Sequence, residues 1–332
     1  MLTAVYIIYL YLKTAYHVFV VNAFKTLKLI KELNQVLYIY NRQLDDYTTG
    51  RIHFYTKQSA LTNLWFSTLR GYKPTAEEAK MALYIGALTP LADDLTDELN
   101  LSSAEILSKV AEVNSESSTN IILLNYLYKK IKSFKNSNLE IALNEAMNAQ
   151  NKSIVQRNEA VLDEKSLATL TKEKGGSATY LYRNILCNNP LTGEKDVIYS
   201  LGYVLQLTND LFDIHKDFTQ KQQTLFTNTL QFQLLLNDFR LSIENCTKAF
   251  LNLDLPLRNK QRFLASLSLL FARGLVGAEM LENLNNIKPT WQLAEMQRSE
   301  LICDMEKPAN IWLSIRFSIK YVNNIENKLL LK

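Results

Sequence analysis

Apolar residues recur along most of this chain at spacings of three and four positions, the pattern that predicts amphipathic helices. The chain also carries two signals of helix starts: Thr75 followed by Glu78, and Ser102 followed by Glu105, each with the spacing of a capping box. Loops are expected at Asn188-Asn189-Pro190 and at Asp254-Leu255-Pro256. Helices are expected in the segments around residues 54–70, 121–135, 200–218, 225–250 and 260–285.

The composition agrees with this helical pattern. The 332 residues include only 9 glycines and 6 prolines. An all-β chain needs turn residues about every 8–12 positions, which this chain does not supply. No linker-like tract and no internal repeat divides the sequence, and 47% of its residues are hydrophobic, enough for a large core. We therefore predict an all-α protein with a single domain over residues 1–332.

Charge, cysteine and histidine content exclude several functional classes. The chain has 37 basic and 33 acidic residues, a net charge of +4, and the basic residues are scattered, which argues against nucleic-acid binding. Three widely separated cysteines, Cys187, Cys246 and Cys303, favour a reducing cytoplasm over a disulfide scaffold. With only three histidines, most zinc hydrolases and the di-iron bundle enzymes are excluded.

Residues 1–24 form an apolar stretch with a single charged side chain, Lys13. Its length approaches that of a bilayer span, although a charge in mid-stretch is costly in lipid. It lacks the charged n-region and the cleavage site of a secretory signal. Two interpretations stay open: a buried first helix, or membrane contact by a span or a peripheral, interfacial helix, with Lys25, Lys28 and Lys31 as interfacial anchors.

The first of two acidic motifs follows an apolar stretch and contains Asp93, Asp94 and Asp97. On a helix, Asp93 and Asp97 are about 40° apart and Asp94 is about 100° from Asp93, so the three carboxylates share one arc. Pro90 precedes them, and its ring would press on the carbonyl of Gly86, where we expect a kink.

The second acidic motif is a stripe on an otherwise apolar helix. Measured around the helix axis from Asn209, Asp213 lies at about 40°, Asp217 at about 80° and Asp210 at about 100°. Gln206 and Gly202 fall on the same face, where the glycine leaves room. Most other positions, including Val204, are apolar.

Carboxylates at such spacings repel one another, and burial strengthens the repulsion. Bound cations would compensate, and a ligand set of oxygens without histidine or thiolate favours Mg²⁺. Taken singly, each stripe can also be interpreted as a solvated helix face. The chain between the two motifs is long enough to form several helices, which allows the stripes to face each other across a bundle.

These residues resemble the class I isoprenoid synthases. The stretch LYIGALTPLADDLTDE resembles the first aspartate-rich motif of the trans-prenyltransferases, including the phytoene and squalene synthase group. Gly202, Gln206 and Asn209, followed by Asp213 and Asp217, resemble that group's second motif. The spacing of Asn209, Asp213 and Asp217 also resembles the second metal triad of terpene cyclases.

The resemblance implies a helical bundle with a central cavity and an enzyme that is a prenyltransferase or terpene synthase. Its substrate would be an allylic isoprenoid diphosphate, ionised to a carbocation that couples or cyclises, with release of pyrophosphate. Three Mg²⁺ ions would be the cofactors, and Asp93, Asp94 and Asp213 the catalytic residues. The implied metal ligands are Asp93, Asp94, Asp97, Asn209, Asp210, Asp213 and Asp217.

Basic residues are expected to complete a diphosphate site. Lys174 precedes Gly175-Gly176, the only adjacent glycine pair, where we expect a helix break resembling that of prenyl synthases. Lys216, within the second motif, and Arg157, upstream, are further candidates, with Arg183 a weaker one. Each can also be a solvated surface charge. Phe212, Tyr84 and Tyr180 are candidates to stabilise a cation, or ordinary core residues.

Two departures from the family pattern bear on the reaction. The Gly-Arg-x-Tyr-x-Pro stretch that follows the second motif of phytoene synthases is missing, since Phe218-Thr219-Gln220-Lys221 stands there. The arginine expected just before the first motif is also missing, with Pro90-Leu91 in its place. Both absences argue against head-to-head condensation and leave elongation, cyclisation or another diphosphate-dependent reaction.

Other functions compete with the enzyme. One is a catalytically inactive helical protein that binds prenyl lipids and keeps the motifs as relics. Another is a membrane-associated helical protein of unrelated role, supported only by residues 1–24. The sequence fixes neither the substrate's chain length nor the oligomeric state, although helical synthases of this kind are often homodimers.

Overall fold

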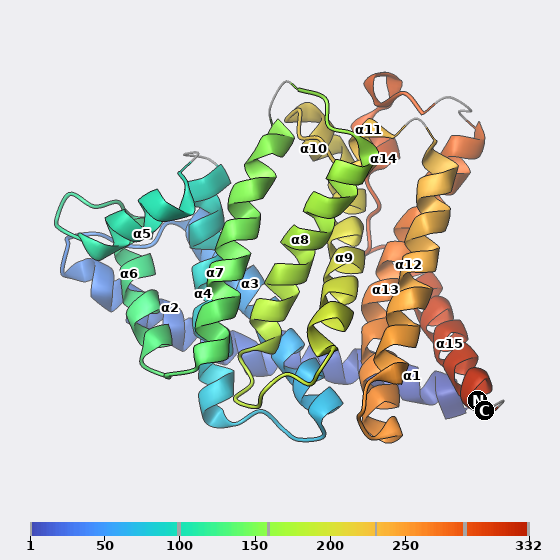
Figure 1. Ribbon diagram of the computed structural model, residues 1–332, viewed down its shortest axis with the longest axis horizontal. Helices are drawn as coiled ribbons and strands as arrows, with labels where there is room; N and C mark the ends of the chain where they lie inside the picture. The colour runs from blue at the N-terminus through green and yellow to red at the C-terminus, as the bar shows by residue number, and fades with distance from the viewer. Residues whose placement is uncertain (1, 98–100, 158–159, 230, 288–290, 331–332) are drawn as a thin grey trace. The chain divides into compact units, whose positions relative to one another are not determined.

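The computed structural model describes residues 2–97, 101–157, 160–229, 231–287 and 291–330. These residues form helices and loops with no strand among them (Figure 1), so the predicted all-α class is confirmed. The chain divides into two compact units, 12–154 with 181–190, and 1–11 with 155–180 and 191–332. The single domain over residues 1–332 stays a prediction.

The first helices run from the N-terminal region through the unit that contains residues 12–154. They are α1 (Leu2–Tyr16), the π-helix η1 (His17–Val21), α2 (Asn22–Tyr38), α3 (Asp46–Arg70), α4 (Ala76–Asp97), α5 (Ser103–Ala111), α6 (Thr119–Lys132) and α7 (Ser137–Ser153). Within this unit α4 packs against α3 and α6.

The remaining helices belong mainly to the other unit. They are the 3₁₀ turn η2 (Ile154–Arg157), α8 (Glu164–Arg183), α9 (Glu194–Phe212), α10 (Ile214–Thr219), α11 (Leu225–Asn228), α12 (Phe232–Asn252), α13 (Leu257–Ile287), η3 (Leu293–Glu295), α14 (Arg298–Leu301) and α15 (Pro308–Leu330). Helix α12 packs on both α9 and α13, and α13 packs on α15 (Figure 1).

Both capping boxes are confirmed. The Thr75 amide donates to Glu78, and the Glu78 amide donates back to the Thr75 hydroxyl at 3.1 Å. Ser102 and Glu105 exchange the same pair of hydrogen bonds at the start of α5. Each reciprocal pair satisfies two backbone N–H donors that a helix start would otherwise leave without a partner, which is why the helices begin there.

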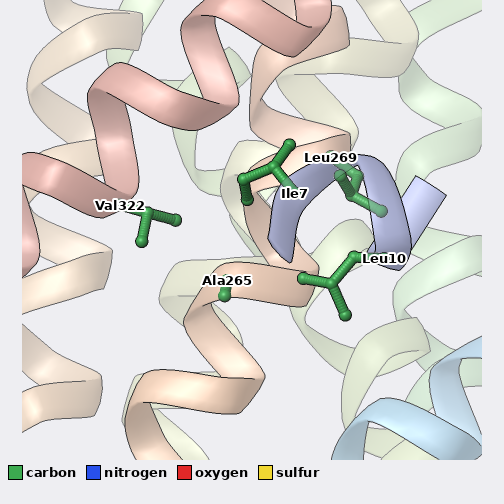
Figure 2. Close-up of a cluster of buried hydrophobic side chains, with 5 residues drawn as sticks. All are labelled: Ile7, Leu10, Ala265, Leu269 and Val322. Carbon is green, nitrogen blue, oxygen red and sulfur yellow. The ribbon is translucent and has the colours of Figure 1, made fainter. Parts of the chain in front are cut away.

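Part of α1 packs against the C-terminal helices of its unit, and both interpretations of residues 1–24 stay open. Ile7 and Leu10 pack against Ala265 and Leu269 of α13 and Val322 of α15 (Figure 2). All five side chains are less than a tenth exposed. The hydrophobic contacts therefore attach the start of α1 to the C-terminal helices of its unit.

The expected helix break at Gly175-Gly176 is wrong. Helix α8 continues through both glycines, and neither has a positive φ angle. A Cβ atom at Gly175 would lie 2.1 Å from the carbonyl oxygen of Gly202, and one at Gly202 would lie 2.2 Å from that of Gly175. The missing side chains let α8 and α9 cross with their backbones almost in contact, so the glycine pair serves packing and does not interrupt the helix.

The helix expected over residues 200–218 is interrupted once. Helix α9 ends at Phe212 and α10 begins at Ile214, with Asp213 between them at φ −95° and ψ 6°. The amides of Asp213 and Asp217 still donate to carbonyls four residues earlier, at 2.9 and 2.8 Å. The helical path therefore continues across a single distorted residue. The segment expected over 225–250 likewise splits, into α11 and α12.

Candidate functional site

The first acidic motif occupies the last turns of α4, which approaches α3 closely at Gly86. A Cβ atom at Gly86 would lie 2.7 Å from the Cα of Thr56 and 2.9 Å from the carbonyl oxygen of Tyr55. Since these are backbone atoms, any side chain at this position would push the two helices apart. Pro90 stands inside α4, which continues past it. The close approach brings side chains of α3 to the motif.

Two side chains of α3 contact the first motif. Arg51 forms an ion pair with Asp94, and its Nη2 lies 3.8 Å from Oδ2 of Asp93. The Tyr55 hydroxyl donates to the same Asp93 oxygen at 3.2 Å. Asp94 is only 5% exposed, so Arg51 neutralises a carboxylate that has lost most of its water.

The electrostatics keep Arg51 charged. Burial by itself lowers the pKa of its guanidinium, but the Tyr47 hydroxyl and the Asp94 carboxylate outweigh this, and the pKa is raised overall. Burial, and then the charge of Asp93, raise the pKa of Tyr55. Tyr55 is therefore a neutral hydrogen-bond donor and Arg51 a permanent cation. Asp97 is a candidate ligand whose side chain lies outside the described part of the chain.

Sequence reasoning missed Arg51 and Tyr55. Tyr47, Arg51 and Tyr55 are spaced by four residues, so they share one face of a helix, and that face was the available signal. The arginine expected just before Asp93 is absent from that place, yet α3 supplies an arginine to the same carboxylates from more than forty residues upstream.

The Arg51 pair gives a first testable prediction. We expect Arg51→Gln to lower the free energy of unfolding by about 2 kcal/mol, because it leaves the buried Asp94 carboxylate without its cation. Arg240→Gln is the matched control, since Arg240 pairs with Glu282, whose side chain is 25% exposed. Loss of that pair should cost less than about 1 kcal/mol. Urea denaturation measures both.

A double variant tests the reason for the effect. If the buried charge of Asp94 causes the loss, Arg51→Gln should cost much less in an Asp94→Asn background. An equal loss in both backgrounds would mean that Arg51 stabilises α3 through packing alone.

The second acidic motif lies where α9 ends and α10 begins. Gln206 Nε2 donates to Oδ1 of Asp210 at 2.7 Å, and Asn209 Nδ2 lies 3.4 Å from Oδ2 of Asp213. These i to i+4 contacts place the amides beside the carboxylates, as the predicted stripe requires. Asn209 is exposed and Asp213 is half-buried, so one edge of the stripe faces solvent.

Two carboxylates of this motif are buried. Burial raises the pKa of Asp210 to about 6, against the opposing hydrogen bond from Gln206. Burial, and then the charges of Asp210 and Asp213, raise the pKa of Asp217 to about 7. Asp210 and Asp217 are 4% and 6% exposed. The motif therefore places carboxyl groups where water does not stabilise their ionised form.

The predicted diphosphate-binding lysine lies close to these carboxylates. The positive charge of Lys174 lowers the pKa of both Asp210 and Asp217. The close crossing of α8 and α9 at Gly175 and Gly202 explains this proximity, because Lys174 stands immediately before the crossing point. Lys174 is predicted from the glycine pair that follows it, although the helix break expected at that pair is absent.

The other two basic candidates border the second motif. Lys216 is exposed on α10, and its charge lowers the pKa of Asp217. Arg157 ends η2, and its Nε lies 3.4 Å from Oε1 of Gln222. The Gln222 amide donates to the carbonyl oxygen of Asp217 at 2.8 Å. Arg157 therefore contacts the loop that follows the motif.

Three weaker candidates for substrate binding or cation stabilisation contact other groups of the protein. Arg183 is fully buried, and its guanidinium donates to the carbonyls of Asn188 and Asn189 at 3.2 and 3.3 Å, which anchors the loop that follows α8. Tyr84 is 1% exposed and its hydroxyl lies 3.2 Å from Glu32. The Tyr180 ring lies 6.2 Å from that of Tyr199.

The donor chemistry can be compared with the needs of Mg²⁺. In the described residues, no three His, Cys, Asp or Glu side chains gather closely enough to hold a metal ion by themselves. Mg²⁺ commonly keeps several waters and binds through one or two carboxylates together with substrate phosphates. The carboxylates of the second motif, with Lys174 beside them, fit that second arrangement: a metal ion brought with a diphosphate.

Comparisons with known proteins add little. No protein-family profile and no curated protein sequence matches the chain. Among solved structures, the fold is similar to that of a geranyltranstransferase from Thermotoga maritima, with 14% sequence identity. The match covers 81% of this chain and 99% of that chain, with a TM-score of 0.41. A likeness at this identity and TM-score gives no argument about activity, which is therefore inferred from the side chains.

Proposed function

We propose that this chain is a Mg²⁺-dependent class I isoprenoid synthase. It would ionise an allylic isoprenoid diphosphate, release pyrophosphate and form a coupled or cyclised isoprenoid. The observation that carries the proposal is the second acidic motif, in which Asp210 and Asp217 are buried beside Asp213 and within the electrostatic reach of Lys174. Buried like charges at this spacing destabilise a fold, so their presence favours a bound cation.

The second motif and the basic residues near it would bind the metal ion and the diphosphate. One or two of the carboxylates of Asp210, Asp213 and Asp217, with the side-chain oxygen of Asn209, would hold Mg²⁺ together with the diphosphate oxygens of the substrate. Bound Mg²⁺ would act as a Lewis acid that stabilises charge on the leaving diphosphate. Lys174 would donate to the diphosphate oxygens, with Lys216 and Arg157 as further donors.

The first motif would contribute a second set of oxygen ligands, Asp93, Asp94 and Asp97, as the family resemblance implies. Arg51 neutralises Asp94 in the described structure. An arginine fork also matches the oxygens of a diphosphate, so Arg51 is a further candidate for binding substrate once a cation takes over the carboxylates. Tyr55 would keep the Asp93 carboxylate oriented through its hydroxyl.

The ion pair of Arg51 also favours a second candidate function. A carboxylate that already has a protein cation does not need a metal ion, so a non-catalytic protein that binds prenyl lipids could keep this pair as a structural element. Such a protein would bind isoprenoid chains without Mg²⁺ and would release no pyrophosphate. The enzyme and the binding protein therefore differ in two measurable properties.

The test measures pyrophosphate release from farnesyl and geranylgeranyl diphosphate, with Mg²⁺ and with a chelator, alongside melting temperature. We expect Mg²⁺-dependent release from at least one substrate. We also expect Mg²⁺ and pyrophosphate together to raise the melting temperature by several degrees, because ligands that bind only the folded state stabilise it. Mg²⁺ alone should have a smaller effect, since the described residues form no complete metal cage.

Two results would contradict the proposal. The first is the absence of release from both substrates together with no joint effect of Mg²⁺ and pyrophosphate on melting. The second is stabilisation by farnesol or a farnesyl thioether in the presence of chelator, without pyrophosphate release, which would support the binding protein.

A further inference from the structure

Two helical segments are long and apolar enough to cross a membrane by length and composition: residues 3–38 and 257–287. They differ in burial. Of the most apolar window in each, 67% is buried in the second segment and only 11% in the first. Helix α13 is thus a core helix, whereas the segment formed by α1, η1 and α2 leaves most of its apolar surface uncovered in the described structure.

Exposed apolar side chains recur along this segment between Leu12 and Leu27, with Lys13 and Lys25 among them, and we call these apolar residues the apolar stripe. Each of its members is at least 39% exposed: Leu12, Tyr16, Phe19, Val20, Phe24 and Leu27. Earlier on α1, Val5, Tyr6, Ile8 and Tyr9 are exposed as well. Isolated exposed apolar residues are common on protein surfaces, but a long series marks an interaction surface.

The π-helix η1 helps to keep the stripe on one side of the helix. In an α-helix each step of four residues rotates a position by about 40°, so Leu12, Tyr16, Val20 and Phe24 would drift around the axis. The wider turn of a π-helix, with its i to i+5 hydrogen bonds, takes up part of this drift. The π turn lies at residues 17–21, in the middle of the stripe.

The opposite face of the same segment is fixed to the protein. Asn22, Thr26, Leu29, Leu33 and Leu37 of α2 are buried, and the Thr26 hydroxyl lies 2.9 Å from that of Thr56 on α3. A helix with one face held in this way, polar contacts included, does not cross a bilayer as an isolated span. Its exposed face can lie in the plane of a membrane surface.

Charge identifies the chemistry of the partner. Residues 1–31 contain no acidic residue, and Lys25, Lys28 and Lys31 are exposed immediately beside and after the stripe. The ammonium of Lys57 on α3 also lies 5.3 Å from the centre of the Phe19 ring. A second copy of the chain would place this lysine row against another acid-free segment, whereas anionic lipid headgroups complement it.

We propose that the apolar stripe and the lysine row of residues 25, 28 and 31 dock on the surface of an anionic lipid bilayer. The aromatic and aliphatic side chains enter the boundary between headgroups and acyl chains, and the lysines contact the headgroups. This inference goes beyond the proposed reaction and does not depend on it.

The experiment is co-sedimentation of the full chain with lipid vesicles. One set of vesicles is phosphatidylcholine alone, and in the other about a third of the lipid is phosphatidylglycerol. We expect the chain to sediment with the anionic vesicles. The variant Leu12→Ser, Phe19→Ser, Phe24→Ser should weaken binding about tenfold or more, because it removes three apolar groups from the docked face.

Two further variants separate the causes. The control Ile141→Ser, Leu234→Ser, Leu241→Ser removes three apolar residues of α7 and α12 that are each more than half exposed, and should bind like wild type. The variant Lys25→Gln, Lys28→Gln, Lys31→Gln should lose the preference for anionic vesicles. Thermal melting checks that all variants are folded, which we expect because the altered side chains are exposed.

A tryptophan at Phe19 gives a readout that does not depend on destabilising variants. The chain has three tryptophans of its own, so the fluorescence of Phe19→Trp is read as its difference from the wild type; this difference should shift to the blue with anionic vesicles and be quenched by lipids brominated in their acyl chains. Sedimentation of the wild type with neither kind of vesicle would overturn the proposal. So would dissociation of a dimer to monomers by the stripe variant without any loss of vesicle binding, which would make a second copy the occupant.

Discussion

Replacing Asp213 by alanine is expected to reduce Mg²⁺-dependent pyrophosphate release by about 10²–10³-fold or more, while the fold survives. Asp213 lies between two helices, half-exposed, and its carboxylate is flanked by the charges of Asp210 and Asp217. A carboxylate at the solvent edge of an acidic stripe, with two further carboxylates beside it, suits a metal ion. An assay of pyrophosphate release measures the loss of activity, and thermal melting checks that the fold survives.

The conservative variant Asp213→Asn sharpens this test. It keeps the size of the side chain and the contact with Asn209, but removes the negative charge. We therefore expect nearly the same loss of activity from Asp213→Asn as from Asp213→Ala. Asp196→Ala is the matched control, because Asp196 is an exposed acid on the same helix α9, outside the motif. Wild-type rates in Asp213→Asn would remove Asp213 from the proposed metal ligands.

The all-helical class and the helix starts follow from local sequence. The capping boxes at Thr75 and Ser102 form because their partners stand three residues away, so no distant contact is needed. The i to i+4 register of Gln206, Asn209, Asp210 and Asp213 is likewise a local property of one helix. These features could be predicted because the period of a helix fixes them.

The chemistry around the first motif could not be predicted in the same way. Arg51 and Tyr55 reach Asp93 and Asp94 because Gly86 lets α4 approach α3, and nothing in the local sequence indicates which helix will be the neighbour. The family resemblance predicts an arginine just before Asp93, where Pro90 and Leu91 stand instead. A cation at the required place can come from another helix, so its absence from a motif does not exclude it from a site.

The sequence marks the glycine pair on α8 as a special position, but it does not indicate that the pair serves a close helix crossing and not a helix break. Glycine is compatible with a helix break and with a close helix crossing, and sequence alone does not separate the two. The crossing is decided by Gly202, which stands opposite Gly175 on another helix. Each of the two glycines is required by the close approach of the other's backbone, although they are 27 residues apart in sequence.

The close crossing of α8 and α9 leads to the second large expected effect. Gly202→Ala should lower the free energy of unfolding by about 3 kcal/mol, at the upper end of the cost of overpacking a well-packed interior. The new Cβ atom would lie 2.2 Å from the carbonyl oxygen of Gly175 and 2.5 Å from the Cα of Gly176. Backbone atoms cannot rotate out of the way as a flexible side chain does, so α8 and α9 must separate. Urea denaturation measures the loss.

Gly50→Ala is the matched control, because Gly50 is also helical and a Cβ atom there would meet nothing within 4 Å. Helix propensity favours alanine by about 1 kcal/mol, so Gly50→Ala should stabilise the chain while Gly202→Ala destabilises it. The opposite signs isolate the steric effect from propensity. Because the crossing also holds Lys174 beside Asp210, Gly202→Ala should weaken stabilisation by Mg²⁺ with pyrophosphate, and Gly50→Ala should not. Equal stabilisation by both substitutions would show that α8 and α9 do not cross at these glycines.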